Sequence, residues 1–367
     1  MKIDQITLTH ICVPLVEPFK ISNGEIAEKD AILVAVYSEG LVGHGESSPM
    51  SGTFYSDETP ESAWNCLTSE LIPRVLRSAP SSIGEVNSLL DQTKGNAFAK
   101  AGIETAFWDL EAQKVKKPLY GLLGSDRNQV ESGLAVGIYA TIRELLLAIE
   151  KNLVEGYKRV KIKIQPGWDM KPLSEVRGEF GTISLMVDAN CAYTRKDISH
   201  LKGLDDFDLM MVEQPLGKDD LEGHAALQSI LRTPVCLDES AKDVPTVKKA
   251  IELKSCKIVN IKIQRVGGLQ NAKEVHDLCA EHRIPVWGGT MPELGIGGAQ
   301  TVHLATLDNF LYPTDVQSSR RWFIDDIINP LLEVHNGLIT LPEEVGNGYS
   351  VDSRKVQQYK VREESFK

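Results

Sequence analysis

Two lysines in one short stretch of the sequence have a spacing that suits acid–base chemistry. Residues 159–164 read Arg-Val-Lys-Ile-Lys-Ile, so charged and branched apolar residues alternate with a period of two. This alternation is typical of a β-strand, in which Lys161 and Lys163 would share one face. On a buried strand the two ammonium groups repel each other and lose solvation, and both effects lower a lysine pKa towards that of a usable base. An edge strand with solvated lysines is the alternative.

Acidic residues end the next apolar runs at a constant distance. Asp188 follows Lys163 by 25 residues, and Glu213 and then Asp238 each follow after 25 more. Lys262 comes 24 residues after the last acid. Three carboxylates that meet in one cleft repel one another unless a cation holds them, and all-oxygen ligands select Mg²⁺ or Mn²⁺ over zinc. The three acids are therefore predicted metal ligands. Capping of the following helices would explain one such acid, but not three in phase between two lysines.

The same spacing predicts the elements that bring these residues together. Each interval fits one strand of about five or six residues, one helix and two short loops. Continuous Val, Ile, Leu and Met runs indicate strands that are buried on both faces, as in a parallel barrel or a doubly wound sheet. In a barrel, the reactive residues lie at the C-terminal strand ends and face one mouth. We expect the first strand at residues 132–139, the seventh at 284–290 and the eighth at 310–315.

Residues 1–125 do not follow this spacing; they alternate like strands at first and then show helical periodicity. The expected strands and helices cover residues 3–13, 31–37, 41–45, 60–76, 83–92 and 97–113. Strands followed by helices predict an α+β domain. The barrel domain would then occupy residues 126–320. The C-terminal segment 321–367 would return to the first domain and pair with it through residues 337–342.

Composition limits the classes of protein. A length of 367 residues suits a barrel of about 250 residues with an added domain. The net charge of −11 argues against a nucleic-acid-binding surface. The N-terminus lacks the apolar core of a signal peptide, and no apolar run approaches the length of a membrane span. Six scattered cysteines without a CxxC pair favour reduced thiols. We therefore predict a cytoplasmic protein that binds neither nucleic acid nor membrane.

Taken together, five motifs resemble the signature of the enolase superfamily, in the arrangement of its muconate lactonizing enzyme subgroup. They are Lys161-Ile-Lys163, Val187-Asp-Ala-Asn190, Val212-Glu-Gln-Pro215, Leu237-Asp-Glu-Ser240 and Lys262. Residues 163–169, 213–220 and 231–240 are in addition similar to the o-succinylbenzoate synthase/N-acylamino acid racemase family. The similarity runs from about residue 15 to about residue 345. It implies an α/β fold, a TIM-type (β/α)8 barrel in the (β/α)7β form, with residues 1–125 as a capping domain over the mouth.

The chemistry expected of such a site is removal of a proton next to a carboxylate. Proton removal creates an enediolate dianion, whose charge a divalent cation, Mg²⁺ or Mn²⁺, would neutralise. Lys163 would abstract the proton on one face, and Lys262 would deliver a proton to the other face or stabilise the anion. Asn190 and Glu239 would support two of the metal ligands, and Lys161 would lower the pKa of the base. Arg265 resembles an arginine of the family's racemase branch, although a solvated arginine is equally consistent.

The family's capping-domain loops line the substrate pocket. Two loops of this chain, residues 17–22 and 47–55, hold Phe19, Met50 and Tyr55, and the resemblance makes these three candidates for substrate binding. Local packing is the alternative role. Exclusion of water by such loops strengthens the electrostatic interactions in the site.

A glycine-rich segment, residues 288–299, follows the seventh predicted strand. Glu293 matches the family pattern and is a further substrate-binding candidate. Pro292 departs from that pattern, and Gly298 stands where the family has an arginine, which puts the identity of the substrate in doubt. Phosphate binding is a weaker interpretation, because the segment has neither a Walker lysine nor a GxGxxG opening.

The resemblance implies a small-molecule carboxylate as substrate and a homo-oligomeric assembly. The first choice of reaction is the dehydration catalysed by o-succinylbenzoate synthase in menaquinone biosynthesis, and N-acylamino acid racemisation is the second. Another racemase, epimerase or cycloisomerase of the superfamily is a further alternative. Two other classes of protein remain as alternatives: a Schiff-base aldolase that uses a lysine, and a non-catalytic binding protein that has kept an ancestral barrel fold. The three phased acids argue against the aldolase.

Overall fold

A parallel sheet carries the lysines and acids singled out above. The computed structural model describes residues 2–22 and 24–367, and within them this sheet has the strand order β11-β10-β9-β8-β7-β6-β5. The strands are β5 (Leu134–Val136), β6 (Val160–Lys163), β7 (Leu185–Asp188), β8 (Val212–Glu213), β9 (Val235–Leu237), β10 (Ile258–Ile261) and β11 (Val286–Gly288). Every residue of these strands is buried, as the continuous apolar runs predict.

Residues 310–315 close the sheet into a barrel. Phe310 pairs in parallel with Val286 of β11, and Thr314 pairs in parallel with Ser132, just before β5. This segment is the predicted eighth strand. The barrel prediction is therefore confirmed, and the doubly wound alternative is wrong.

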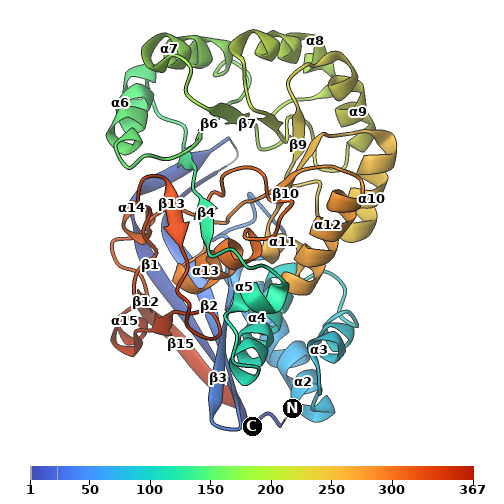
Figure 1. Ribbon diagram of the computed structural model, residues 1–367, viewed down its shortest axis with the longest axis vertical. Helices are drawn as coiled ribbons and strands as arrows, with labels where there is room; N and C mark the ends of the chain where they lie inside the picture. The colour runs from blue at the N-terminus through green and yellow to red at the C-terminus, as the bar shows by residue number, and fades with distance from the viewer. Residues whose placement is uncertain (1, 23) are drawn as a thin grey trace.

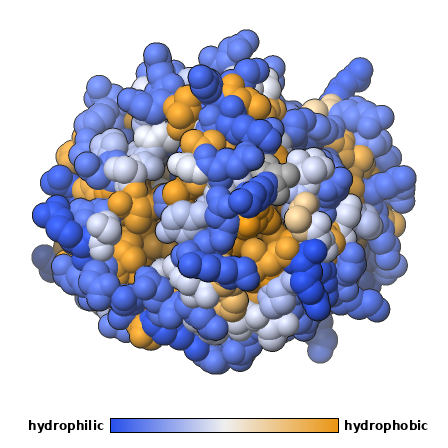
Figure 2. Space-filling model, turned by 90° about the horizontal axis from the view of Figure 1, so that it is seen from below, coloured by the Kyte–Doolittle hydropathy of each residue, from blue (hydrophilic) through white to orange (hydrophobic). Residues whose placement is uncertain are grey.

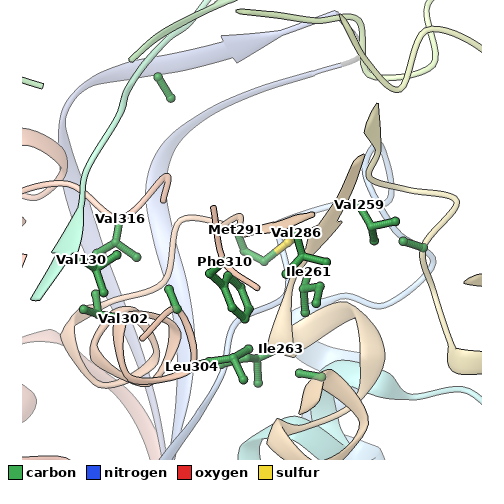
Figure 3. Close-up of a cluster of buried hydrophobic side chains, with 14 of the residues drawn as sticks. Val130, Val259, Ile261, Ile263, Val286, Met291, Val302, Leu304, Phe310 and Val316 are labelled. Carbon is green, nitrogen blue, oxygen red and sulfur yellow. The ribbon is translucent and has the colours of Figure 1, made fainter. Parts of the chain in front are cut away.

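Helices alternate with the strands and cover the outside of the barrel, in an arc around β6 to β10 (Figure 1). The arc consists of α6 (Ile142–Leu153), α7 (Met170–Phe180), α8 (Ile198–Leu201), α9 (Leu221–Ile230), α10 (Val244–Leu253) and α12 (Leu269–Glu281), with short 3₁₀ turns at η2 (Arg195–Asp197) and η3 (Lys202–Phe207). The remaining helices of this part, α11 (Ile263–Val266), α13 (Gly295–Leu304) and α14 (Ser319–Trp322), lie against the N-terminal part of the chain. The local sequence determines the residue at which several of these helices begin. For example, α6 begins at Ile142 because Thr141 and Glu144 form a capping box. Figure 3 shows part of the core, where side chains of β10, β11, α13 and residue Phe310 share one hydrophobic cluster.

The N-terminal part is a four-stranded antiparallel sheet with helices against it. Its strand order is β15-β1-β2-β3, with β1 (Gln5–Ile21), β2 (Gly24–Ser38), β3 (Leu41–Ser47) and β15 (Lys360–Phe366). The helices are α1 (Pro60–Cys66), the π-helical turn η1 (Leu67–Leu71), α2 (Ile72–Ser78), α3 (Ile83–Leu90), α4 (Ala97–Lys114) and α5 (Leu119–Leu123). The strand β1 is longer than predicted, so Phe19 lies on a strand, opposite Ile26, and not in a loop.

The C-terminal segment returns along a different route from the expected one. Residues 337–342 do not pair with the N-terminal sheet; β13 (Leu338–Thr340) pairs with β4 (Gln129–Glu131), beside the barrel, because Ile339 is buried in the main hydrophobic cluster with Val130. The chain ends with β12 (Ile328–Asn329), β14 (Ser350–Val351), α15 (Ser353–Tyr359) and then β15, which pairs with β1. The division at residues 125 and 320 stays a prediction.

Two buried glutamates fix the N-terminal part to the barrel. Glu104 of α4 accepts hydrogen bonds from the backbone N–H groups of Leu269 (2.7 Å) and Gln270 (2.8 Å) at the start of α12. Glu46 of β3 accepts from Leu294 and Gly297, both at 2.8 Å, at the start of α13. Each carboxylate therefore caps a barrel helix from the neighbouring domain and complements its dipole.

The contact between β3 and α4 gives a first testable prediction. A Cβ atom at Gly45 would lie 2.1 Å from the backbone oxygen of Gly102, so Gly45→Ala forces the strand and the helix apart. We expect the free energy of unfolding to fall by about 1–3 kcal/mol in denaturant titration. Gly84→Ala in α3 is the control, since its Cβ would meet only Ser82 Oγ at 3.9 Å, and alanine favours a helix. Equal unfolding midpoints for wild type and Gly45→Ala would contradict the packing described.

The end of the molecule that carries both termini is mostly hydrophilic at its surface (Figure 2). Hydrophobic side chains on this face gather in separate patches between charged and polar ones. In the part of the chain that the structure describes, no helix is both long enough and apolar enough to cross a membrane.

Candidate active site

The predicted catalytic and metal-binding residues lie side by side at the C-terminal ends of the strands. The register of the sheet pairs Lys163 of β6 with Asp188 of β7, and Asp188 with Glu213 of β8. Asp238 directly follows β9, and Lys262 directly follows β10. All five side chains expose 6% or less of their surface. The two lysines therefore flank three acids on adjacent strands, and the alternative of solvated lysines on an edge strand is wrong.

Asn190 ties one lysine to two acids. Lys163 Nζ donates to Asp188 Oδ2 at 2.6 Å and to Asn190 Oδ1 at 2.9 Å. The side-chain N–H group of Asn190 donates in turn to Glu239 Oε1 at 3.1 Å. Asn190 adopts a left-handed backbone conformation with φ of 43°, in which its own N–H group donates to Asp188 Oδ1 at 2.9 Å. This turn orients the amide between the two carboxylates.

The second lysine is held by an acid and a tyrosine, and the same acid also binds an arginine. Lys262 Nζ donates to Asp238 Oδ2 at 2.9 Å and to the hydroxyl group of Tyr55 at 2.7 Å. Arg265 donates to the other oxygen of Asp238 and to the backbone oxygen of Asn260. Burial opposes ionisation of Asp238, but Arg265 and Lys262 hold its pKa below the usual value. Because the Arg265 side chain is buried, the alternative of a solvated arginine is wrong.

Lys161 is surrounded by carboxylates. Its Nζ lies 3.1 Å from Glu213 Oε2 and 3.7 Å from Asp188 Oδ2, and it also donates to Asp315 Oδ2. Burial lowers the pKa of Lys161, but Asp315, Glu213 and Asp188 raise it above the usual value. The neighbouring lysine therefore does not set the pKa of Lys161, because three acids neutralise the charge of Lys161. Asp315, at the end of the eighth strand, was not among the predicted site residues.

The carboxylates crowd one another. Burial and the charges of Asp188 and Asp238 raise the pKa of Glu213 to about 8, although Asn260 Nδ2 donates to its Oε1 at 2.6 Å. Burial and the charge of Asp238 likewise raise the pKa of Glu239 to about 7. The helices that follow the three strands are capped by other residues, namely Thr194, Asp220 and Asp243. The alternative that the three acids are helix caps is therefore wrong.

One small cavity of about 40 Å³ joins the barrel mouth to the N-terminal domain. Seven predicted site residues line it: Phe19, Met50, Tyr55, Lys161, Lys163, Asn190 and Lys262. Thr290, Asp315 and Trp322 also line it and were not predicted. Phe19 packs edge-on against Trp322 with ring centroids 4.8 Å apart, and Lys163 Nζ lies 5.8 Å from the centre of the Phe19 ring. Glu293 does not line this cavity; its Oε2 accepts a hydrogen bond from the Met291 N–H group at 3.2 Å.

Three amide groups of the glycine-rich segment, at the start of α13, already donate to carboxylates. The N–H groups of Leu294 and Gly297 donate to Glu46, as described above, and that of Gly295 donates to Asp326 Oδ1 at 3.0 Å. The phosphate-binding interpretation is therefore wrong. A Cβ at Gly298 would lie 3.0 Å from Leu332 Cδ1, so Leu332 takes the space that a larger side chain would need.

The donor set suits a hard divalent cation. In this structure the acids bind lysine and arginine side chains, and among residues 2–22 and 24–367 no group of three His, Cys, Asp or Glu residues is arranged as a metal site. The three acids nevertheless offer only oxygen atoms from adjacent strands, the ligands that Mg²⁺ and Mn²⁺ prefer. Glu239 Oε2 is buried, and no group in the described part of the chain donates a hydrogen bond to it. The residues present therefore fit such an ion.

Comparison with known proteins decides the family. Residues 144–356 match the family described as enolase C-terminal domain-like, and residues 4–124 match the mandelate racemase/muconate lactonizing enzyme N-terminal domain. The chain belongs to the enolase superfamily. A solved structure from Listeria innocua, titled a member of this superfamily, superimposes with a TM-score of 0.95 at 35% identity and covers 100% of this chain and 99% of its own.

Two curated relatives narrow the position within the superfamily. An o-succinylbenzoate synthase of Geobacillus kaustophilus is 44% identical over 360 residues, which are 98% of this chain and 96% of the relative. An N-succinylamino acid racemase of an Amycolatopsis species is 41% identical over 349 residues, 95% of each chain. The chain is therefore an enzyme of the muconate lactonizing enzyme subgroup and of the o-succinylbenzoate synthase/N-acylamino acid racemase family, as the sequence motifs predicted. Members of the superfamily use a divalent metal ion, typically Mg²⁺.

Proposed function

We propose that this enzyme is an o-succinylbenzoate synthase, which dehydrates a cyclohexadiene carboxylate with the help of Mg²⁺ or Mn²⁺. The supporting observation is that Lys163 and Lys262 line the same cavity from the two sides of three adjacent acids. Full-length similarity to o-succinylbenzoate synthases supports the choice of reaction. An aldolase would need no such group of acids, and a non-catalytic protein would need neither the acids nor the lysine pair.

Asp188, Glu213 and Asp238 would hold the metal ion. When bound, the ion supplies positive charge beside the carboxylate oxygens of the substrate, where negative charge develops. The lysines that contact these acids would turn towards the substrate, and Asn190 and Glu239 would keep the ligands oriented. Burial makes each of these charge interactions stronger than it would be in water.

Lys163 would act as the base and then as the acid. Its uncharged amine takes the α-proton, and the electron pair of the broken C–H bond forms the enediolate. The resulting ammonium group returns that proton to the hydroxyl group that leaves from the neighbouring carbon. The C–O bond breaks, water is released, and the amine is restored. Lys262, anchored by Asp238 and Tyr55, would keep a positive charge on the opposite side of the enediolate.

Racemisation of N-succinylamino acids is the second candidate, because a relative of nearly equal similarity carries that name. In that reaction Lys163 would remove the α-proton from one enantiomer, and Lys262 would deliver a proton to the opposite face. Arg265 and Lys262 both donate to Asp238, so Arg265 would orient Asp238 and, through it, the second lysine. The same residues serve both reactions, since each begins with removal of an α-proton.

An assay of both substrates in D₂O tests this choice. We expect the cyclohexadiene carboxylate to lose water and form o-succinylbenzoate, with a kcat/KM at least about 10⁴ M⁻¹s⁻¹. With an N-succinylamino acid, a racemase would incorporate deuterium at the α-carbon without loss of water, as NMR would show. Exchange without any dehydration would favour the racemase. Absence of both reactions with Mg²⁺ present would rule out the two functions.

Phe19, Met50 and Tyr55 are our candidates for the wall that contacts the substrate, because all three line the cavity beside the lysines. The cavity is smaller than a typical ligand pocket of about 300 Å³ or more, so these side chains would move when substrate binds. We also propose that the substrate is a small-molecule carboxylate, that the enzyme works in the cytoplasm and that it assembles as a homo-oligomer. Size-exclusion chromatography with light scattering tests the last point.

A further inference from the structure

Asp315 connects two cations inside the barrel. It lies at the end of the eighth strand and exposes 4% of its surface. Its Oδ1 lies 2.8 Å from Nη1 of Arg159, and its Oδ2 accepts a hydrogen bond from Lys161 Nζ. Arg159, Lys161 and Lys163 alternate along β6 and the residue before it, so all three enter the barrel interior. The carboxylate of Asp315 therefore bridges two cations, Lys161 of β6 and Arg159 just before that strand.

Arg159 is itself held in one place. Its Nη2 donates to the backbone oxygen of Pro313 at 2.9 Å, and its guanidinium group lies 5.1 Å from the centre of the Trp287 ring. A Cβ atom at Gly133 would lie 2.5 Å from Arg159 Cζ, so only glycine at that position leaves room for the guanidinium group. Arg159 is thus a rigid, buried support for Asp315, and it does not itself line the cavity that would receive substrate.

Lys161 lies where this support meets the proposed metal ligands. Its ammonium group is shared between Asp315 on one side and Glu213 (3.1 Å) and Asp188 (3.7 Å) on the other. It also lies 4.9 Å from the centre of the Trp287 ring, the ring that stacks on Arg159. The ammonium group already donates to Glu213 Oε2, an oxygen atom that a metal ion would need, and a closer approach would strengthen this competition.

We propose that Asp315 is a positioning residue, which shares the Lys161 ammonium with Glu213 and Asp188, weakens its hold on these two acids and thereby sets the affinity of the site for its divalent metal. This inference rests on the proposed function, because it takes these two acids as metal ligands. Without the charge of Asp315, the only anionic partners left within reach of Lys161 among the described residues would be the metal ligands themselves. The lysine, which already donates to Glu213 Oε2 at 3.1 Å, would then compete more strongly with the ion for the same oxygen atoms.

Isothermal titration of the purified protein with Mg²⁺, in the absence of substrate, measures this affinity without reference to turnover. We expect Asp315→Asn to raise the dissociation constant by about 10- to 100-fold, the range found when residues behind metal ligands are changed. Asp109→Asn is the matched control. Asp109 is also a buried aspartate with backbone partners, His44 and Asn347, but it lies outside the barrel mouth, so its variant should bind Mg²⁺ as the wild type does.

A double-mutant cycle separates positioning from a direct effect of charge. If Asp315 acts through Lys161, then Asp315→Asn should leave the Mg²⁺ affinity unchanged in a Lys161→Met background. A full 10-fold loss in that background would overturn the positioning role, and so would an unchanged affinity of the single variant Asp315→Asn with its fold intact by circular dichroism. If the wild type itself binds no Mg²⁺, the proposed metal site fails, which is a different result from failure of this inference.

Discussion

Lys163→Ala is expected to reduce kcat by about 10²–10⁴-fold, the usual contribution of a positioned general base, with little change in secondary structure. The amine of Lys163 would be the group that removes the α-proton, and Lys161, the other lysine of β6, is held by three carboxylates. Formation of o-succinylbenzoate should fall accordingly, because dehydration begins with this proton transfer. Near-normal dehydration by the variant would defeat the proposed mechanism.

Lys163→Arg separates this chemical role from a structural one. Arginine keeps a positive charge beside Asp188, to which Lys163 donates at 2.6 Å, but it cannot lose its proton at neutral pH. We therefore expect Lys163→Arg to be as inactive as Lys163→Ala while it unfolds closer to the wild-type temperature. Lys171→Ala, which changes an exposed lysine of α7, is the control and should keep full activity.

Removal of divalent metal is expected to abolish turnover. Charge neutralisation by a metal ion contributes several kcal/mol to the stability of a transition state, so dialysis against EDTA should lower kcat by about 10³-fold or more. Mg²⁺ or Mn²⁺ should restore activity, since the proposed ligands are all oxygen atoms. Undiminished activity after chelation, with metal content verified by elemental analysis, would argue for a metal-free mechanism such as Schiff-base formation.

Asp238→Asn should weaken the binding of the divalent metal without abolishing it. The substitution removes one proposed ligand charge, so more Mg²⁺ should be needed for half-maximal activity. It also leaves Lys262 and Arg265 without the carboxylate that both contact, and breaking a buried ion pair costs about 3–5 kcal/mol of stability. Metal affinity and melting temperature should therefore be measured on the same preparation. An unchanged requirement for Mg²⁺ would exclude Asp238 from the metal site.

The spacing of charged residues predicted most of the barrel and of the candidate site. Each interval between Lys163 and Lys262 contains one strand and one helix, and a residue at the end of a parallel strand faces the mouth whatever the details of the loops. Continuous apolar runs predicted strands that are buried on both faces. These features are local, so they can be recognised in a sequence before any long-range contact is known.

The features that were missed depend on contacts between distant residues. The sequence placed Asp315 at the end of the predicted eighth strand, but Asp315 lies outside the regular spacing of charged residues between Lys163 and Lys262. It was therefore not recognised as a site residue, and only its contacts with Lys161 and Arg159 reveal that role. The pKa of Lys161 could not be predicted from its neighbour Lys163, because Asp315 approaches it from the eighth strand.

The same reason explains two corrections outside the barrel strands. Phosphate binding was considered for the glycine-rich segment because its local sequence does not reveal a partner for its amide groups. That partner, Glu46, comes from the distant N-terminal sheet. Residues 337–342 have the alternating pattern of a strand, but that pattern does not say which neighbour will pair with them. In the structure, residues 338–340 pair with β4, because this pairing buries Ile339 in the main hydrophobic core.

A crystal structure of the enzyme soaked with Mn²⁺, with its anomalous scattering recorded, tests the central claim most directly. We predict one strong anomalous peak at the C-terminal ends of β7, β8 and β9, within about 2.0–2.3 Å of an oxygen atom from each of Asp188, Glu213 and Asp238. Lys163 and Lys262 should then point into the cavity from its two sides. A peak elsewhere, or acids that still bind only lysine and arginine with Mn²⁺ present, would contradict the account.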